Sequence, residues 1–140
     1  MPLTKLGLYH TDITDLSPLR GMPLEVLHLG STKVIDLSPL KGAPLRELWI
    51  EDSPSISDLS PLDGTPLKIL SAGRTSIKDL APIKNCPLKH LSIYGTNVTD
   101  LRPIEHMDLD YLKVTEGNIE CGMDFVKRVT LKMKKAPMYE

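Results

Sequence analysis

The sequence predicts a solenoid, a coil of short stacked repeats that share one aliphatic core. Two periodic features indicate it. Ten of the 12 prolines fall into two series with a spacing of 21 or 22 residues, and a leucine-rich pattern recurs in phase with them. Leucine occurs 23 times among the 140 residues, whereas phenylalanine and tryptophan occur once each, so aliphatic side chains must fill the core. This length fits one domain.

Five regular repeats each begin at a proline and follow the pattern P-L-x-x-L-x-L-x-x-T-x-I-x-D-L-S-P-L-x-G-x. They occupy residues 2–22, 23–43, 44–65, 66–86 and 87–107. The third is one residue longer, and Pro54 is the simplest candidate for the insertion. We therefore divide the chain into five regular repeats in 1–107, a degenerate sixth repeat plus a C-terminal cap in 108–135, and a loose tail in 136–140.

The Leu-x-Leu segment of each repeat alternates with a period of two, which predicts a short strand with its leucines pointing inward. In the third repeat these inward residues are Leu48 and Ile50. Further aliphatic positions follow in the second half of each repeat. One such coil cannot bury its apolar face alone, so each repeat must pack against its neighbours.

Two polar columns, meaning the same position in successive repeats, flank the second half of the pattern. The hydroxyl column comprises Thr11, Thr32, Ser53, Thr75 and Thr96, and the carboxylate column comprises Asp15, Asp36, Asp58, Asp79 and Asp100. Hydroxyls both donate and accept, so they suit backbone groups where the chain leaves the strand. Aspartate before Leu-Ser-Pro suits an Asx turn or a helical cap. A calcium ladder is the alternative, disfavoured because the glycine-rich nonapeptide of calcium-binding solenoids is absent.

This pattern resembles the leucine-rich repeat, in the short bacterial form with S-P-L that is found in internalin-like proteins. Similar arrays accompany bacterial serine/threonine kinases and large surface proteins. The sequence departs from the common form: threonine replaces the usual ladder asparagine, the repeat is one residue shorter, and a Gly-x-Pro-Leu junction replaces an inner leucine. The resemblance covers residues 2 to about 119. It implies an α/β solenoid, a right-handed coil with a parallel concave sheet and short helical turns or loops on the convex side.

The first repeat has no N-terminal cap, which leaves Leu6 and Leu8 on an exposed edge strand over about residues 5–9. One explanation is that the chain is a fragment of a longer repeat protein. The other is that the edge pairs with another chain, so weak homo-oligomerisation through this strand is a hypothesis.

The C-terminal segment has the pattern of a cap. We expect a short helix over 123–127, followed by a strand in which Val129, Leu131 and Met133 alternate with polar residues. The lysines and arginine of this segment are expected to block end-to-end pairing as edge-strand charges, and an anionic partner is the alternative.

Several classes of function are disfavoured. The 17 basic and 18 acidic residues nearly balance, which argues against nucleic acid as a partner. No apolar run reaches the length of a membrane span, so we expect no membrane partner, and the lack of a signal peptide slightly favours the cytoplasm. No catalytic motif is present, so we predict no enzymatic activity and no cofactor.

The cysteines and histidines are not arranged as metal ligands. Cys86 and Cys121 lack C-x-x-C spacing and are expected to be buried or half-buried thiols, and no two histidines share a column. We therefore predict no metal site.

The outward positions along and just after the predicted strands are rich in aromatic residues. They hold the only tryptophan, three of the four tyrosines and three of the four histidines. Exposed Trp and Tyr commonly anchor interfaces. The predicted ligand-binding patch on the concave face comprises Tyr9, His28, Trp49 and Glu51, flanked by Arg74 and Tyr94. Arg74 is also expected to pair with Asp52 on the surface. The alternative is that Trp49 merely shields the thin sheet.

The sequence therefore favours a non-catalytic module that binds a protein or peptide on its concave face. The mixed charges of the patch fit a protein ligand better than nucleic acid. The alternative is a structural spacer within a larger multidomain protein, for example the regulatory part of a kinase. These two functions differ in what the outward columns should hold: a spacer needs only solvated residues there, whereas a binder should display aromatic anchors.

Overall fold

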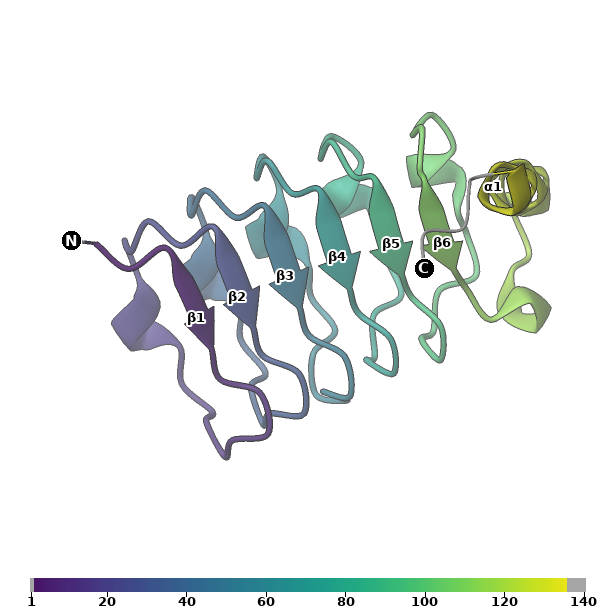
Figure 1. Cartoon of the computed structure of the whole chain (residues 1–140). Helices are drawn as coiled ribbons and strands as arrows, with labels where there is room; N and C mark the ends of the chain where they lie inside the picture. Colours follow the sequence, from purple (N-terminus) through teal and green to yellow (C-terminus); the bar gives the residue numbers. More distant parts are fainter. Residues whose placement is uncertain (1, 136–140) are drawn as a thin grey trace.

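A single parallel sheet runs along the whole solenoid, in the strand order β1-β2-β3-β4-β5-β6 (Figure 1). The structure is a computed structural model and describes residues 2–135. The six strands are β1 Lys5–Gly7, β2 Val26–His28, β3 Glu47–Trp49, β4 Ile69–Ser71, β5 His90–Ser92 and β6 Tyr111–Lys113. Neighbouring strands pair in register, so that Leu27 lies opposite both Leu6 and Leu48. The predicted solenoid fold is confirmed.

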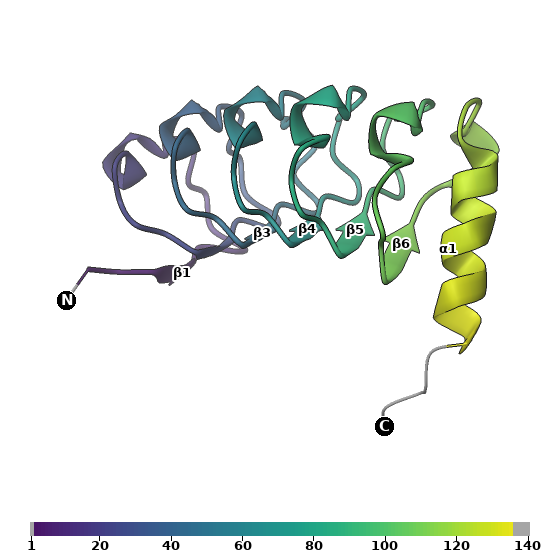
Figure 2. The same cartoon turned by 90° about the horizontal axis from the view of Figure 1, so that it is seen from above.

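Short 3-10 turns form the opposite side of the coil and lie along the outer edge of its arc, with the sheet on the inner, concave edge (Figure 2). They are η1 Ser17–Leu19, η2 Ser38–Leu40, η3 Ser60–Leu62, η4 Ala81–Ile83, η5 Arg102–Ile104 and η6 Glu116–Asn118. In η1 to η5 a proline occupies the first turn, where its fixed φ suits the helix and its missing N–H costs no hydrogen bond.

The core consists of stacked aliphatic columns. In the third repeat the inward side chains are at most 1% exposed, and they are Leu45, Leu48, Ile50, Ile56, Leu59 and Leu62. The equivalent residues of the neighbouring repeats cover them on both sides, which is the nearest-neighbour packing expected of a solenoid. The longer third repeat leaves this stacking intact: Glu47 pairs with Ile69, and the exposed Pro54 lies in a turn outside the strands.

The hydroxyl column satisfies backbone carbonyls where the chain leaves each strand, as predicted. The buried Thr32 Oγ1 donates to the carbonyl oxygen of Leu29 at 2.8 Å, and Thr75 Oγ1 donates to that of Ala72 at 2.8 Å. Because these carbonyls are removed from water, each hydrogen bond avoids the cost of an unsatisfied acceptor.

The aspartate column forms the predicted Asx turns. Asp36 Oδ1 accepts the backbone N–H of Ser38 at 2.8 Å, and Asp58 Oδ1 accepts that of Ser60 at 2.8 Å. The Ser60 hydroxyl and N–H lower the pKa of Asp58, and the Ser38 N–H and hydroxyl lower that of Asp36, because these hydrogen bonds favour the charged form. Among residues 2–135, no group of three or more His, Cys, Asp or Glu side chains is arranged to hold a metal ion.

The C-terminal segment corrects the sequence-based prediction. A single helix, α1 (Met123–Lys135), takes the place of the expected short helix and strand. It buries Phe125, Val126 and Val129 beside β6 at the end of the solenoid (Figure 2). The alternation of Val129, Leu131 and Met133 wrongly predicted a strand, because Val126, Val129 and Met133 also lie on one face of a helix. Leu131 lies off that face and is 57% exposed.

The basic residues of this segment accordingly lie on a helix and are not edge-strand charges. Lys132 Nζ pairs with Asp108 at 2.8 Å and with Asp110 at 2.7 Å, which ties α1 to the residues that flank β6. Within the described part of the chain, α1 is the only α-helix and is too short and polar to cross a membrane. The predicted tail, 136–140, lies outside the described residues, and the division into repeats, cap and tail stays a prediction.

The first coil is open on one side, as expected for an edge strand. Leu3 is 44% exposed, and Leu6 and Leu8 are only half-buried, whereas the equivalent Leu27 and Leu29 are fully buried. The thiols also follow the prediction, with Cys86 buried and Cys121 half-buried.

Candidate functional site

The concave face carries a hollow of about 260 Å³ over the carboxyl ends of β1, β2 and β3. It is lined by Tyr9, His10, His28, Gly30, Ser31, Trp49, Glu51 and Asp52. Gly30 occupies the outward column that holds Tyr9 in the preceding repeat and Glu51 in the following one. Because glycine has no side chain, a gap opens between those two larger residues. The hollow therefore follows from one small residue in a column of large ones.

An aromatic row borders this hollow. Strand register places His28 beside Trp49, and their rings stack with centroids 5.3 Å apart and planes inclined by 9°. The ring of Tyr9 lies 6.5 Å from that of His28 at a tilt of 60°. Tyr9 is 60% exposed, while His28 and Trp49 are half-buried. The row is thus held by the sheet and remains accessible from solvent.

A tight turn after each of the first four strands sets the other border. Its residues have left-handed backbone conformations, with φ between 56° and 57° at His10, Ser31, Asp52 and Arg74. The corresponding residue of the fifth repeat is Gly95, with φ of 67°. Left-handed φ is uncommon for residues with a Cβ, and Asp and His are among the residue types that tolerate it best. The first four repeats therefore place a side chain at this border of the hollow, although glycine would adopt the left-handed backbone conformation with less strain.

Glu51 and Asp52 are both held by hydrogen bonds on the concave face. The Ser71 hydroxyl donates to Glu51 Oε2. The Arg74 guanidinium donates from Nε and Nη2 to the two carboxylate oxygens of Asp52, at 2.9 Å for Nη2. These bonds lower the pKa of Asp52 and raise that of Arg74. The predicted ion pair is confirmed, and because both side chains are exposed to water it adds little to stability.

Tyr94 occupies a second glycine gap in the same column. A Cβ built at Gly73 would approach Tyr94 Cδ1 to 2.8 Å, so the ring lies directly over this glycine. The Arg74 guanidinium carbon is 5.1 Å from the centroid of the ring, and Lys113 Nζ is 4.1 Å from it. Both distances permit cation–π attraction. Tyr94 is therefore packed by its own chain.

The structure brings four of the six predicted site residues together. Tyr9, His28, Trp49 and Glu51 all line the hollow, whereas Arg74 and Tyr94 lie beside it toward the C-terminus. Whether these residues bind a ligand stays a prediction. Sequence reasoning missed Gly30, although a glycine between large residues in an outward column is a signal that could have been found.

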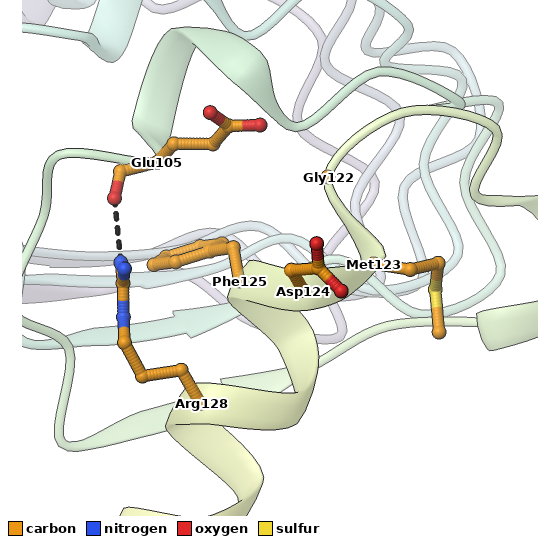
Figure 3. A pocket seen from close by; sticks show the side chains of 6 residues that line it. All are labelled: Glu105, Gly122, Met123, Asp124, Phe125 and Arg128. Atoms are coloured by element: carbon orange, nitrogen blue, oxygen red, sulfur yellow. Dashed lines mark hydrogen bonds between the residues drawn. The ribbon is translucent and has the colours of Figure 1, made fainter.

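A second hollow of about 280 Å³ lies where α1 meets the fifth repeat (Figure 3). It is lined by Glu105, Gly122, Met123, Asp124, Phe125 and Arg128. Arg128 Nη2 donates to the carbonyl oxygen of Glu105 at 2.6 Å, and its guanidinium carbon lies 5.1 Å from the Phe125 ring centroid. These contacts join the helix to the fifth repeat, so this hollow is a seam between α1 and the solenoid.

One strand per repeat, continuous aliphatic columns and a 3-10 turn on the outer side define a leucine-rich-repeat solenoid. The fold of this chain is that solenoid in its internalin-like form. Internalin C2 of Listeria monocytogenes is similar over 80% of this chain and 51% of its own, with 28% identity and a TM-score of 0.76. Internalin F of the same species is similar over 94% of this chain and 39% of its own, with 26% identity and a TM-score of 0.77.

This chain thus spans about half the length of the first internalin and less of the second. No protein-family model matches the chain, and no curated protein sequence matches it.

Proposed function

We propose that this chain is a non-catalytic module that binds a protein or peptide on its concave face. The observation that carries the proposal is the aromatic-bordered hollow in which Tyr9, His28, Trp49 and Glu51 meet. Aromatic side chains at the centre of a surface are frequent anchors of protein interfaces, because they bury a large area at a small cost in conformational entropy. The internalin-like fold supports the proposal, since concave solenoid surfaces commonly serve as binding faces.

The degree of exposure of the aromatic row favours binding over shielding of the sheet. The inward leucines are equally buried where the outward column lacks aromatic rings: Leu70 is 1% exposed and Leu91 is 0% exposed. Neighbouring positions of the same outward column hold Ser71 and Ser92, so serine suffices to cover the sheet elsewhere. A spacer would need no more than such residues. Large rings at His28 and Trp49 are therefore better explained by a ligand.

The test compares capture of partners by wild type and by Trp49→Ala from one cell extract, with the captured proteins quantified by mass spectrometry. We expect at least one partner to be recovered by wild type and lost, by about tenfold or more, with Trp49→Ala, as for an interface hot spot. Lys78→Ala, an exposed substitution away from the sheet, is the matched control and should retain the partner.

Circular dichroism must show that both variants are folded. Equal recovery by folded Trp49→Ala and wild type would contradict the concave site and favour the spacer function.

A further inference from the structure

Two glycines in the outward column, Gly30 and Gly73, create equivalent gaps, and only one of them is filled. The Tyr94 ring lies over Gly73, and a Cβ there would clash with it. Over Gly30 the nearest atoms to a built Cβ are the Glu51 carbonyl oxygen at 3.4 Å and Glu51 Cγ at 3.6 Å. The gap at Gly73 is filled by the ring of Tyr94 from the same chain. The gap at Gly30 is therefore open to a group from outside the chain.

The two gaps differ in the charged side chains that line them. The filled gap holds an aromatic ring between two cations, Arg74 and Lys113. The open gap is lined by two carboxylates, Glu51 and Asp52, and by no lysine or arginine. Arg74 pairs with Asp52 from beside the hollow, so among residues 2–135 Glu51 is the lining carboxylate that pairs with no lysine or arginine. A positively charged group complements Glu51 in the open gap.

Of these carboxylates, Glu51 retains the capacity to bind a further donor. Both oxygens of Asp52 accept hydrogen bonds from Arg74, whereas Glu51 receives one hydroxyl, from Ser71. An ionised carboxylate has about four lone-pair sites. Glu51 also lies at the end of the gap opposite Tyr9, so a donor that enters beside the rings reaches it.

We propose that the hollow over Gly30 receives an arginine side chain of the protein or peptide ligand. The methylene stem lies against the row of Tyr9, His28 and Trp49, and the guanidinium donates hydrogen bonds to the Glu51 carboxylate. The guanidinium is weakly hydrated and presents a planar fork of donors, which makes arginine a better fit than lysine. The volume of about 260 Å³ falls below the range of about 300–1,000 Å³ typical of small-molecule pockets, which suits one side chain.

This inference rests on the proposed function, and its test separates the two. A phage library of random peptides is selected on wild type, and the enriched peptides are synthesised with arginine or with the neutral isostere citrulline. Dissociation constants are measured by the fluorescence of Trp49, the only tryptophan in the chain. We expect enrichment of arginine and an about tenfold weaker binding of the citrulline peptides, as for the loss of one charge-assisted hydrogen-bonded pair.

Two variants locate the arginine. Glu51→Gln should weaken the arginine peptide about tenfold and leave the citrulline peptide nearly unchanged, since the interaction energy belongs to the pair. Gly30→Leu fills the hollow at a residue without a left-handed φ and should abolish the preference for arginine. Ser92→Leu, which adds the same side chain to β5 outside the hollow, is the control and should bind as wild type does.

Three outcomes count against the inference. If the enriched peptides lack arginine but lose binding in Trp49→Ala, the arginine site is wrong and the concave binding face stands. Equal loss of both peptides in Glu51→Gln would overturn the pairing with Glu51. If no selected peptide depends on Trp49, monitored in that variant by fluorescence polarisation of labelled peptide, both the arginine site and the proposed function are contradicted.

Discussion

The imidazole of His28 lies flat against the indole of Trp49, with ring centroids 5.3 Å apart and planes inclined by 9°. The contact joins two adjacent repeats, because the parallel register of β2 and β3 brings equivalent positions side by side. A stacked aromatic pair contributes about 0.5–1.5 kcal/mol beyond the area that it buries. The same two rings thus stabilise the interface between coils and form the border of the concave hollow.

Substitution of His28 by alanine should therefore have two effects. The free energy of unfolding should fall by about 0.5–1.5 kcal/mol, because the stacking is lost. Trp49 emission should move to longer wavelength, because the indole loses its cover. Urea denaturation followed by fluorescence measures both, with Lys78→Ala, an exposed position outside the sheet, as the control. An unchanged emission maximum would contradict the stacked arrangement.

Leu48 lies at the centre of the aliphatic core, and Leu48→Ala should destabilise the protein by about 2–5 kcal/mol, as other buried leucine truncations do. The stability of a solenoid is a sum of repeat and nearest-neighbour interface terms. Because Leu48 lies in a central coil, its loss weakens the interfaces on both sides and should lower the stability of the whole array. Thermal or urea unfolding checks this. A shift no larger than that of the exposed variant Lys78→Ala would show that the column assignment is wrong.

The Asx turns of the aspartate column make stability depend on pH. Hydrogen bonds from Arg102 lower the pKa of Asp100 from 3.8 to about 2, and those from Ser17 lower the pKa of Asp15. Since the folded-state pKa lies below the unfolded value, this stabilisation is complete above the unfolded pKa. It is lost as the pH falls from about 4 through about 2.

Urea denaturation between pH 7 and pH 2 should show a plateau and then a fall. Asp100→Asn, which keeps an acceptor oxygen but does not titrate, should flatten that fall relative to wild type. Asp63→Asn, an exposed position outside the aspartate column, serves as a control. A fall of equal steepness in wild type and Asp100→Asn would argue against the Asx turn as its origin.

The helical cap can be tested at Lys127, an exposed position within α1. Lys127→Pro should cost about 3 kcal/mol or more, because proline removes a helix hydrogen bond and clashes with the preceding turn. Lys127→Ala keeps the helix and should be close to wild type. Circular dichroism and urea unfolding of the pair provide the measurement. Equal stability of the two variants would contradict a continuous helix at this position.

Among residues 2–135, β1 pairs with β2 alone, and its other edge is flanked by the 44% exposed Leu3, which leads to the prediction of weak self-association through pairing with a second copy. Sedimentation equilibrium over a concentration series should show a rise in average mass for wild type and a smaller rise for Leu3→Lys. A strictly monomeric wild type at high concentration would rule this association out.

The repeated pattern was sufficient to predict the columns, because in a stack of in-register coils each position lies next to its equivalent in the neighbouring repeat. This reasoning placed His28 and Trp49 in one patch and paired Asp52 with Arg74. In the structure the first two residues are in contact, and the ion pair is confirmed. The same reasoning also assigned the inward leucines and the Asx turns of the aspartate column, since both depend on local pattern and on nearest neighbours alone.

Only the tertiary structure decided what lies outside this regularity. At the C-terminus no further repeat fixes the register, and apolar residues at 126, 129, 131 and 133 are compatible with either a helix or a strand until packing against β6 selects the helix. The two glycine gaps share one column but differ in the residue of the next repeat, which is Glu51 after Gly30 and Tyr94 after Gly73. The Tyr94 ring closes the gap at Gly73, whereas Glu51 is hydrogen-bonded to Ser71 and a hollow remains over Gly30. Side-chain conformations of this kind depend on neighbours across coils, for Tyr94 on Arg74 and Lys113.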